Sequence, residues 1–429
     1  MAHTSSGTAV NGTRASDRIK PERKRNIAAV TIGNGLEFYD FTVYSFFATV
    51  IGKQFFPAEG SNQLLLAFAT YGIGFFMRPL GSIVLGQYAD RVGRKAAMVL
   101  TLWLMAIGSL IFVLAPTYSQ IGIAAPLLIV FARLLQGFAI GGEVGASTSY
   151  LLETAGAHER GYFTSWQFFS QGLSVLLGAL VGLSVNYSLS EAQLSAWGWR
   201  LPFVFGLLVI PVGAYMRRHL KESEEVQQGV SHRLSWQQHK RVLVAGVLIA
   251  IGGTSSSYVI LHYLSNFAVA QLHLPLSVGI WTGCAAGAVQ VALAVASGRA
   301  CDRWGRKRMI VCSRWALLLL IYPAFVLLQH SPNLLTLVLV ASVLAALLVA
   351  NTVPSLALLA EIFPAQVRAT GLSVTYALSS IVFGGFAQFF CTLLISVTGS
   401  PSAPAVYLIG CGLLSLVGLV LVKEPVQPQ

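Results

Sequence analysis

The sequence predicts an all-α integral membrane protein with twelve transmembrane helices, arranged as two six-helix bundles related by pseudo-symmetry. The first observation behind this prediction is composition: 55% of the 429 residues are hydrophobic and 10% are charged, whereas a soluble domain carries about 25% charged residues. The second is a series of apolar segments, each long enough to supply the roughly 20 residues of a membrane-spanning helix. The third is a polar loop that occurs twice, at matching places in the two halves.

The repeated loop reads G-x-x-x-D-R-x-G-R-K and occupies Gly86–Lys95 and Gly298–Lys307. Its two aspartates, Asp90 and Asp302, are 212 positions apart. In both places the loop joins two apolar segments of membrane length. The preference for Lys and Arg in cytoplasmic loops would explain the basic residues of the motif, but not the aspartate and the two glycines at the same spacing twice.

A second repeat supports the same division of the chain. Glu153 and Arg160 stand seven positions apart after one apolar segment, and Glu361 and Arg368 stand seven positions apart after another, 208 residues later. Two parallel halves of about 200 residues, related by an axis along the membrane normal, are an architecture of secondary transporters.

The apolar segments and the polar runs between them define the expected order of elements. Residues 218–240 form the longest polar run after the N-terminal region, so we expect a cytoplasmic linker there between bundles at 27–217 and 241–423. Residues 1–26 contain no apolar core of a signal peptide and, like residues 424–429, are expected to form a cytoplasmic tail. The twelve expected spans are 27–51, 64–88, 97–115, 122–151, 163–186, 199–217, 241–267, 276–299, 309–328, 334–360, 370–396 and 404–422.

The distribution of Lys and Arg predicts the orientation. The N-terminal region, both copies of the repeated loop and the central linker are rich in these residues, whereas the loops on the other side offer Lys53 and Arg200. An excess of Lys and Arg marks the cytoplasmic side, so both termini are expected to be cytoplasmic. The net charge of +12 follows from this sorting, and nucleic-acid binding is not needed to explain it. The five cysteines lie in or beside apolar segments of the second half and indicate free thiols rather than a disulfide framework.

The paired loops resemble the signature loop of the major facilitator superfamily. Four further motifs narrow the resemblance to its metabolite:proton symporter family: N-G-L-E-F-Y-D-F at 34–41, R-P-L-G at 78–81, R-L-L-Q-G at 133–137 and W-G-W-R-L-P-F at 197–203. Helices one to six look most like those of the citrate/tricarballylate symporters. The resemblance implies proton-coupled symport of a small carboxylate across the cell inner membrane, with 2-oxoglutarate, shikimate, and proline or betaine as other substrates of the family.

The resemblance also implies a role for the repeated loops. In this superfamily the loop Asp and Arg hold the cytoplasmic side closed through charge contacts with neighbouring helix ends. The residues to which this gating role falls here are Asp90, Arg91, Arg94, Asp302, Arg303 and Arg306, with Glu153, Arg160, Glu361 and Arg368 completing the network.

Five ionisable residues fall inside expected helices of the first half: Glu37, Asp40, Arg78, Arg133 and Glu143. An ionised side chain at the bilayer centre costs about 2.5–3.5 kcal/mol even on insertion scales. We therefore expect these groups to face an aqueous cavity and to pair there. A fixed ion-pair network that locks three helices together is the alternative interpretation.

The chemistry of these groups suggests a division of roles. Burial raises the pKa of a carboxyl and a nearby guanidinium lowers it, so the expected proton-coupling set is Asp40 with Glu37 and Glu143. Guanidinium groups bind carboxylates bidentately, so Arg78 and Arg133, with Arg200 at the outer rim, are expected to bind the substrate. The other expected substrate-binding residues are Gln136, Tyr258, His262, Asn266, Asn351 and Gln388.

Other functions remain open at this stage. A proton-coupled exporter of a drug or metabolite, and a sensor or channel, could use the same architecture. An enzyme is not expected, because the sequence offers no nucleophile–base pair, no metal-ligand cluster and no G-x-x-x-x-G-K-[ST] phosphate-binding loop. We expect no cofactor, and as partners a small carboxylate, protons and the lipid bilayer, with the protein acting as a monomer.

The predicted topology can be tested by thiol labelling. A cysteine introduced at Ser331 in a Cys-free background is expected to react with an impermeant maleimide added outside the cell, because the expected ninth and tenth spans meet there. A cysteine at Ser61 is expected to behave in the same way. Labelling of either position only from the cytoplasmic side would contradict the predicted orientation.

Overall fold

The computed structural model describes residues 21–58, 61–92, 94–141, 159–208, 211, 236–363 and 368–422. These residues form helices, and no strand occurs among them. Most of the predicted linker, residues 218–235, lies outside the described part of the chain.

The first half of the chain contributes long helices joined by short ones. The first predicted span corresponds to two consecutive helices, and the second, third and fifth each to a single long helix, while only parts of the fourth and sixth are described. The elements are α1 (Pro21–Phe46), α2 (Ala48–Phe55), α3 (Ser61–Val92), α4 (Arg94–Leu114), α5 (Tyr118–Ile121), α6 (Ala124–Gly141), α8 (Arg160–Ser188), α9 (Glu191–Ala196), η1 (Gly198–Arg200) and α10 (Leu201–Gly206).

The second half differs by two π-helical segments, each inserted in the middle of a span. In both places the chain continues as an α-helix, so each span is one helix with a local change of hydrogen bonding. The elements are α12 (Trp236–Tyr258), η3 (Val259–Tyr263), α13 (Leu264–Ala270), α14 (Leu276–Trp304), α15 (Arg306–His330), α16 (Leu334–Ile362), α17 (Arg368–Ser380), η5 (Ile381–Gly385), α18 (Ala387–Thr398) and α19 (Ala403–Leu421).

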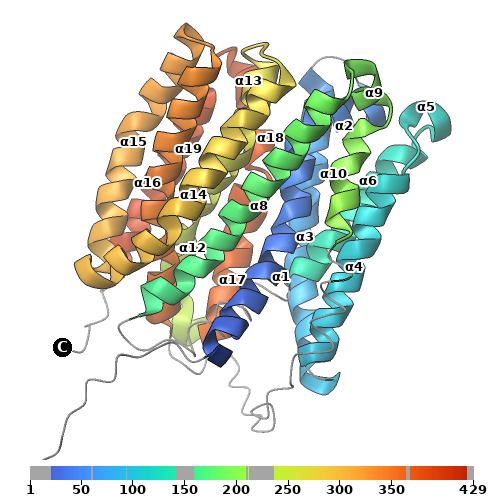
Figure 1. The fold of residues 1–429 in the computed structure, drawn as a ribbon. Helices are drawn as coiled ribbons and strands as arrows, with labels where there is room; N and C mark the ends of the chain where they lie inside the picture. The colour runs from blue at the N-terminus through green and yellow to red at the C-terminus, as the bar shows by residue number, and fades with distance from the viewer. Residues whose placement is uncertain are drawn as a thin grey trace, which may run out of the picture.

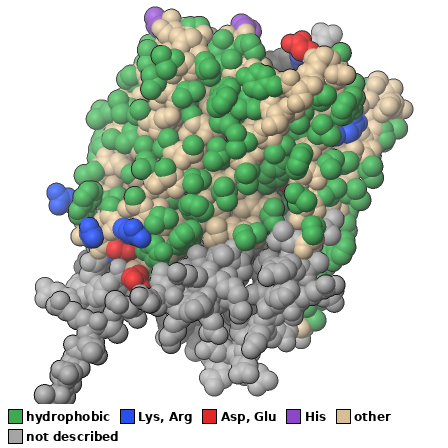
Figure 2. All heavy atoms as spheres, in the orientation of Figure 1, with side chains coloured by type: hydrophobic (Ala, Val, Ile, Leu, Met, Phe, Trp, Pro, Cys, Tyr) green, Lys and Arg blue, Asp and Glu red, His purple; other side chains and the backbone are tan. Residues whose placement is uncertain are grey.

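The length and hydropathy of these helices fit a membrane protein. Nine helices of the described chain are long and apolar enough to cross a bilayer. The other three predicted spans correspond to α1 with α2, to α4, whose apolar stretch is shorter, and to α10, which is followed by undescribed residues. Figure 2 shows that one face of the molecule is largely hydrophobic between its two ends, with charged side chains near those ends.

The helices run side by side from one end of the molecule to the other (Figure 1). The beginning of α1 and the end of α19 lie at the same end, which we call the terminal end. The short helices α5 and α9 lie at the other end, which we call the opposite end. The two halves of the chain meet along α8 and α14, the pair of helices with the most extensive contact in the molecule.

Glycines allow α3 and α6 to pack backbone against backbone. The Cα of Gly137 lies against the carbonyl of Gly74, and that of Gly141 lies against the carbonyl of Arg78. Small residues permit such close approach between membrane helices. The contact fixes the relative height of Arg78 on α3 and Arg133 on α6, so it determines the geometry of the polar groups described below.

The substitution Gly137→Ala tests this contact. The added Cβ would collide with the Gly74 carbonyl oxygen, and overpacking costs about 1–3 kcal/mol. We expect the unfolding temperature in detergent to fall by several degrees. The matched control is Gly410→Ala on α19, where a Cβ would meet nothing within 4 Å. There, Ala should leave stability unchanged or raise it by about 0.5–1 kcal/mol, and equal effects at the two positions would contradict the packing argument.

Candidate functional site

Asp40 on α1 is buried at the junction of four helices of the first half. Its side chain is 2% exposed. One carboxylate oxygen, Oδ2, accepts hydrogen bonds from the Ser109 hydroxyl on α4 and, at 3.0 Å, from the Gln136 amide on α6. The other oxygen, Oδ1, lies against the backbone of Gly206 on α10 and has no hydrogen-bond partner among the described residues. The carboxylate is therefore held firmly through one oxygen only.

Arg133 on α6 is fully buried and belongs to the same network. Its Nη1 donates a hydrogen bond of 2.9 Å to Gln136 Oε1. The amide of Gln136 thus stands between the carboxylate of Asp40 and the guanidinium, where the sequence predicted direct pairing of acid and base. Aromatic rings enclose the guanidinium, whose Cζ lies 3.9 Å, 4.8 Å, 4.9 Å and 5.7 Å from the ring centroids of Tyr44, Phe112, Phe41 and Tyr71.

Arg78 on α3 is also buried, at 4% exposure, but it is bound differently. Its Cζ lies 3.7 Å from the ring centroid of Phe75 and 5.4 Å from that of Phe41. Its Nε and Nη1 find no hydrogen-bond partner among the described residues. Across the junction of the two halves, the Tyr258 hydroxyl is near enough to this guanidinium for a side-chain hydrogen bond, and the Tyr376 hydroxyl lies within its electrostatic reach.

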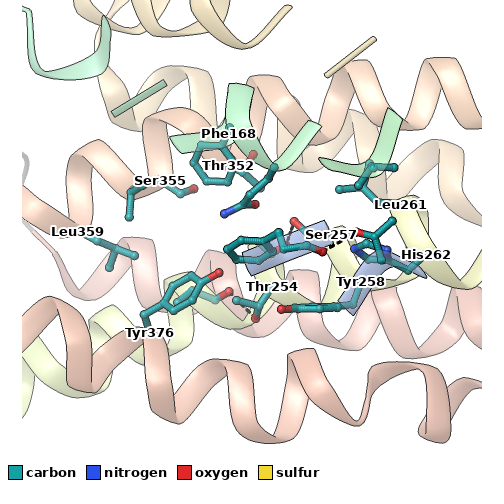
Figure 3. Close-up of a pocket in the computed structure, with 17 residues that line it drawn as sticks. Phe168, Thr254, Ser257, Tyr258, Leu261, His262, Thr352, Ser355, Leu359 and Tyr376 are labelled. Carbon is teal, nitrogen blue, oxygen red and sulfur yellow. Dashed lines mark hydrogen bonds between the residues drawn. The ribbon is translucent and has the colours of Figure 1, made fainter. Parts of the chain in front are cut away.

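A pocket lies between the two halves beside these groups (Figure 3). Its walls come from α1 and α8 of the first half and from α12, η3, α16 and α17 of the second. Tyr258 and His262, both predicted from the sequence, line it. The sequence analysis missed Tyr376 on α17 and the hydroxyls of α12 and α16, because a Tyr, Ser or Thr within an apolar helix gives no signal of which way it faces. The pocket residues missed in this way include Thr254, Ser257, Thr352, Ser355 and Tyr376.

Two other predicted binding residues join the halves nearer the opposite end. Asn266 on α13 donates a hydrogen bond of 2.8 Å to the carbonyl of Ser45 on α1. The hydroxyl of the same Ser45 donates a hydrogen bond of 2.9 Å to the side chain of Gln388 on α18. The described structure therefore places Asn266 and Gln388 in a contact between halves rather than among the residues that line the pocket.

The last two predicted binding residues make contacts within one half. The side chain of Asn351 on α16 accepts a hydrogen bond from Arg314 on α15, which is fully buried, and donates one of 3.1 Å to the carbonyl of Ile310. Arg200 donates a hydrogen bond of 2.7 Å to the carbonyl of Ala115, at the end of α4. Neither residue lies among those that line the pocket.

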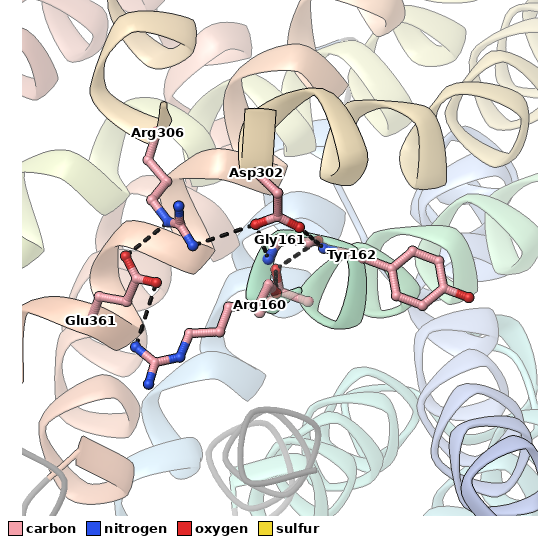
Figure 4. A network of polar contacts seen from close by, with 7 residues as sticks. Arg160, Gly161, Tyr162, Asp302, Arg306 and Glu361 are labelled. Carbon is pink, nitrogen blue, oxygen red and sulfur yellow. Dashed lines mark hydrogen bonds and ion pairs between the residues drawn. The ribbon is translucent and has the colours of Figure 1, made fainter. Parts of the chain in front are cut away.

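At the terminal end, four predicted gating residues meet in one network (Figure 4). Asp302, near the end of α14, accepts hydrogen bonds of 2.9 Å from the backbone N–H groups of Gly161 and Tyr162. These groups belong to the first turn of α8, where an acidic side chain is favoured by about 0.3–1 kcal/mol. The repeated loop of the second half is therefore bound directly to a helix of the first half.

Glu361, near the end of α16, extends this network. Its carboxylate lies 2.8 Å from Nε of Arg306 and 3.5 Å from Nη1 of Arg160. Arg306 also contacts Asp302 at 3.4 Å. The Arg160–Glu361 pair crosses between the halves, whereas Arg303 is exposed and makes no ion pair among the described residues.

Several predicted residues cannot be placed in this network or beside the pocket. They lie outside the described residues or have side chains outside them, and their roles remain predictions. These are Glu37, Asp90, Arg91, Arg94, Glu143, Glu153 and Arg368.

Comparison with known proteins identifies the family. The sugar (and other) transporter family matches residues 26–225 and 211–427. The chain belongs to this family. The transporter is 36% identical over 400 residues to a citrate-proton symporter of Klebsiella pneumoniae, covering 91% of this chain and 90% of the relative. It is 33% identical over 384 residues to an alpha-ketoglutarate permease of Escherichia coli, covering 86% and 87%.

Solved structures agree with the fold of the transporter. A D-xylose-proton symporter superposes with a TM-score of 0.75 at 18% identity, covering 94% of this chain and 97% of that one. The predicted fold class is thereby confirmed, as are the predictions of a secondary transporter in place of an enzyme and of a multi-pass inner-membrane protein. Within the described residues, contacts between the halves occur both at the terminal end and nearer the opposite end.

Glu361→Gln tests whether the network keeps the terminal end of the transporter closed. Loss of the two ion pairs should favour the state in which the halves separate there. Removing about 1–2 kcal/mol of stabilisation from the closed state changes the ratio of closed to open protein by about 5–30-fold. Cys301, which is buried beside Asp302, reports on this opening. In a background without the other cysteines, we expect Glu361→Gln to increase its rate of reaction with a permeant maleimide by about that factor.

Arg303→Gln is the control for this experiment. It removes a charge from the same loop, but from an exposed side chain outside the network. The labelling rate of Cys301 should then stay at its original value. An equal increase for both variants would mean that overall loop charge, and not the Glu361 ion pairs, sets the accessibility.

Proposed function

We propose that the protein imports a small carboxylate by proton-coupled symport, and that citrate or another tri- or dicarboxylate is the first candidate. The observation that carries the proposal is the buried chain from Asp40 through Gln136 to Arg133, beside a pocket between the halves. It unites a group that can take up a proton with a group that attracts anions. The citrate-proton symporter relative supports the same function.

The chain of hydrogen bonds offers a way to couple the two ligands. Gln136 accepts a hydrogen bond from the guanidinium of Arg133 and donates one to the carboxylate of Asp40. A change in charge at either of these groups therefore affects the hydrogen bonding of the other. An anion that approaches Arg133 and Arg78 offsets the positive charge that stabilises ionised Asp40. Asp40 then binds a proton more readily, and by linkage the proton favours binding of the anion.

The network at the terminal end fits a cytoplasmic gate. With the termini cytoplasmic, as the Lys and Arg distribution predicts, Asp302, Arg306, Glu361 and Arg160 would close the cytoplasmic side in one state of an alternating-access cycle. The contacts of Ser45 with Asn266 and Gln388 would close the external side in another state. Nothing in this cycle requires a second copy of the chain, and we propose a monomer.

Other functions make different demands on the site. An exporter of lipophilic cations needs acidic groups free of cationic neighbours, whereas here the buried acid is joined to Arg133 and a second guanidinium lies nearby. Other substrates of the family are separate candidates, since an alpha-ketoglutarate permease and putative proline/betaine transporters are also similar to this chain. Counterflow of radiolabelled citrate against 2-oxoglutarate, shikimate and betaine in proteoliposomes would rank them.

Asp40→Asn tests the coupling. The amide keeps the shape and one acceptor oxygen for Ser109 and Gln136, but it cannot exchange a proton. We expect substrate exchange at equilibrium to remain within a few-fold of the original rate, whereas accumulation driven by an imposed pH gradient is abolished. The measurement is uptake of radiolabelled citrate into proteoliposomes with and without the gradient.

The control is Glu191→Gln, the same change of acid to amide at an exposed position of α9. It should retain both exchange and accumulation. Should Asp40→Asn still concentrate citrate in response to the proton gradient, Asp40 would not be the coupling residue.

A further inference from the structure

We infer that Arg78, Tyr258 and Tyr376 form the subsite that holds a carboxylate of the substrate, and that Tyr376 is a residue that determines specificity. The inference rests on the proposed function and refines it, because it separates the two buried arginines. Arg78 binds the substrate anion, whereas Arg133 serves the proton-coupling network.

The first step is the availability of the Arg78 donors. The side chain is 4% exposed, and Nε and Nη1 have no hydrogen-bond partner within the described part of the chain. Burying donors of a charged group without a partner is costly. The ring of Phe75, 3.7 Å from Cζ, stabilises the cation but accepts no in-plane hydrogen bond. Two donors of the guanidinium, Nε and Nη1, are therefore available to a carboxylate.

The second step is the contrast with Arg133. Its Nη1 is already bound to Gln136, while its Nε and Nη2, like two donors of Arg78, have no hydrogen-bond partner among the described residues. What differs is the surroundings, because the guanidinium of Arg133 lies within the rings of Tyr44, Phe112, Phe41 and Tyr71. Neither arginine is among the residues that line the pocket, but Arg78 packs against Phe75, whose ring contacts that of the pocket residue Tyr258. A substrate would have to displace several buried rings to reach Arg133. Arg133 can interact electrostatically with a nearby anion, but it is poorly placed to bind one directly.

The third step is the position of the two tyrosines. Tyr258 and Tyr376 both line the pocket, and both hydroxyls lie within electrostatic reach of Arg78. Figure 3 shows them on the same side of the pocket. The ring of Tyr258 packs at 5.4 Å from that of Phe75, the ring that supports Arg78. A carboxylate that enters from the pocket would meet a guanidinium from the first half and two hydroxyl donors from the second.

The composition of the pocket limits what else the substrate can carry. Among the described residues that line it there is no Asp, Glu, Lys or Arg, and the polar groups are hydroxyls, one glutamine and His262. Such walls hydrogen-bond hydroxyl, carbonyl or protonated carboxyl groups without balancing a full charge. The pocket therefore matches a di- or tricarboxylate that binds with one ionised carboxylate at Arg78 and its other carboxyl and hydroxyl groups uncharged against the walls.

Three variants test the subsite with citrate, 2-oxoglutarate and shikimate as probes: Arg78→Gln, Tyr376→Phe and Tyr258→Phe. Binding is measured by thermal stabilisation of the purified protein, and KM by counterflow in proteoliposomes. We expect Arg78→Gln to weaken binding of the transported probe by about 30-fold or more, since hydrogen bonds to charged groups are the strong ones. Tyr376→Phe should raise KM by about 5–10-fold and leave kcat and the unfolding temperature without ligand unchanged.

Matched controls separate the site from general effects. Tyr322→Phe removes the same hydroxyl from an exposed tyrosine of α15, and Arg308→Gln removes the same charge from an exposed position. Neither should change KM. Because Tyr376→Phe deletes a single oxygen atom, it keeps the test decisive even if Arg78→Gln does not fold.

The outcomes distinguish this inference from the proposed function. Unchanged KM in Tyr376→Phe, or unchanged affinity in Arg78→Gln, would overturn the subsite while symport stands. Weakened binding in both variants, with wild-type transport that ignores an imposed pH gradient, would support the subsite and overturn proton coupling. Failure of all three probes to bind the wild-type protein would overturn both.

Discussion

The cost of an ionised group inside a membrane governs this structure. Asp40, Arg78, Arg133 and Arg314 are all buried at 4% exposure or less, in helices whose other residues are mainly apolar. Each is compensated in its own way. Asp40 and Arg133 are linked through the amide of Gln136, Arg314 is bound by the carbonyl of Gly252 and the side chain of Asn351, and Arg78 is supported by an aromatic ring. Arg78 is the one we assign to the substrate, because the ring that supports it contacts the ring of Tyr258, which lines the pocket.

The same principle organises the contact between the halves. At the terminal end the carboxylates of Asp302 and Glu361 are bound by backbone N–H groups and by arginines of both halves. Nearer the opposite end the contacts are neutral hydrogen bonds between Ser45, Asn266 and Gln388. Contacts of this strength can be exchanged during a cycle. Apolar packing also joins the halves, since one buried hydrophobic cluster contains residues of both, among them Phe46, Tyr71 and Tyr258.

Glycine contacts between helices set the positions of the buried charges. The backbone contact of Gly137 with Gly74, and of Gly141 with Arg78, sets the heights of the arginines. The Cα of Gly206 against Asp40 sets the position of the carboxylate. A methyl group at any of these positions would move a buried charge away from its partners, so small residues far from the substrate contribute to the geometry of coupling.

The sequence by itself determined the membrane class, the family and the presence of ionisable residues such as Asp40, Arg78 and Arg133 inside apolar segments. Hydropathy, the twice-repeated loop and the rarity of charge inside apolar segments are all properties of the chain that need no coordinates. Tertiary structure decided which of these groups meet. Gln136 between Asp40 and Arg133, the bond of Asn351 to Arg314 and the place of Tyr376 beside the pocket depend on how each helix is rotated about its axis. That rotation is fixed by packing against neighbouring helices, and in helices that are apolar on nearly every face the sequence carries little record of it.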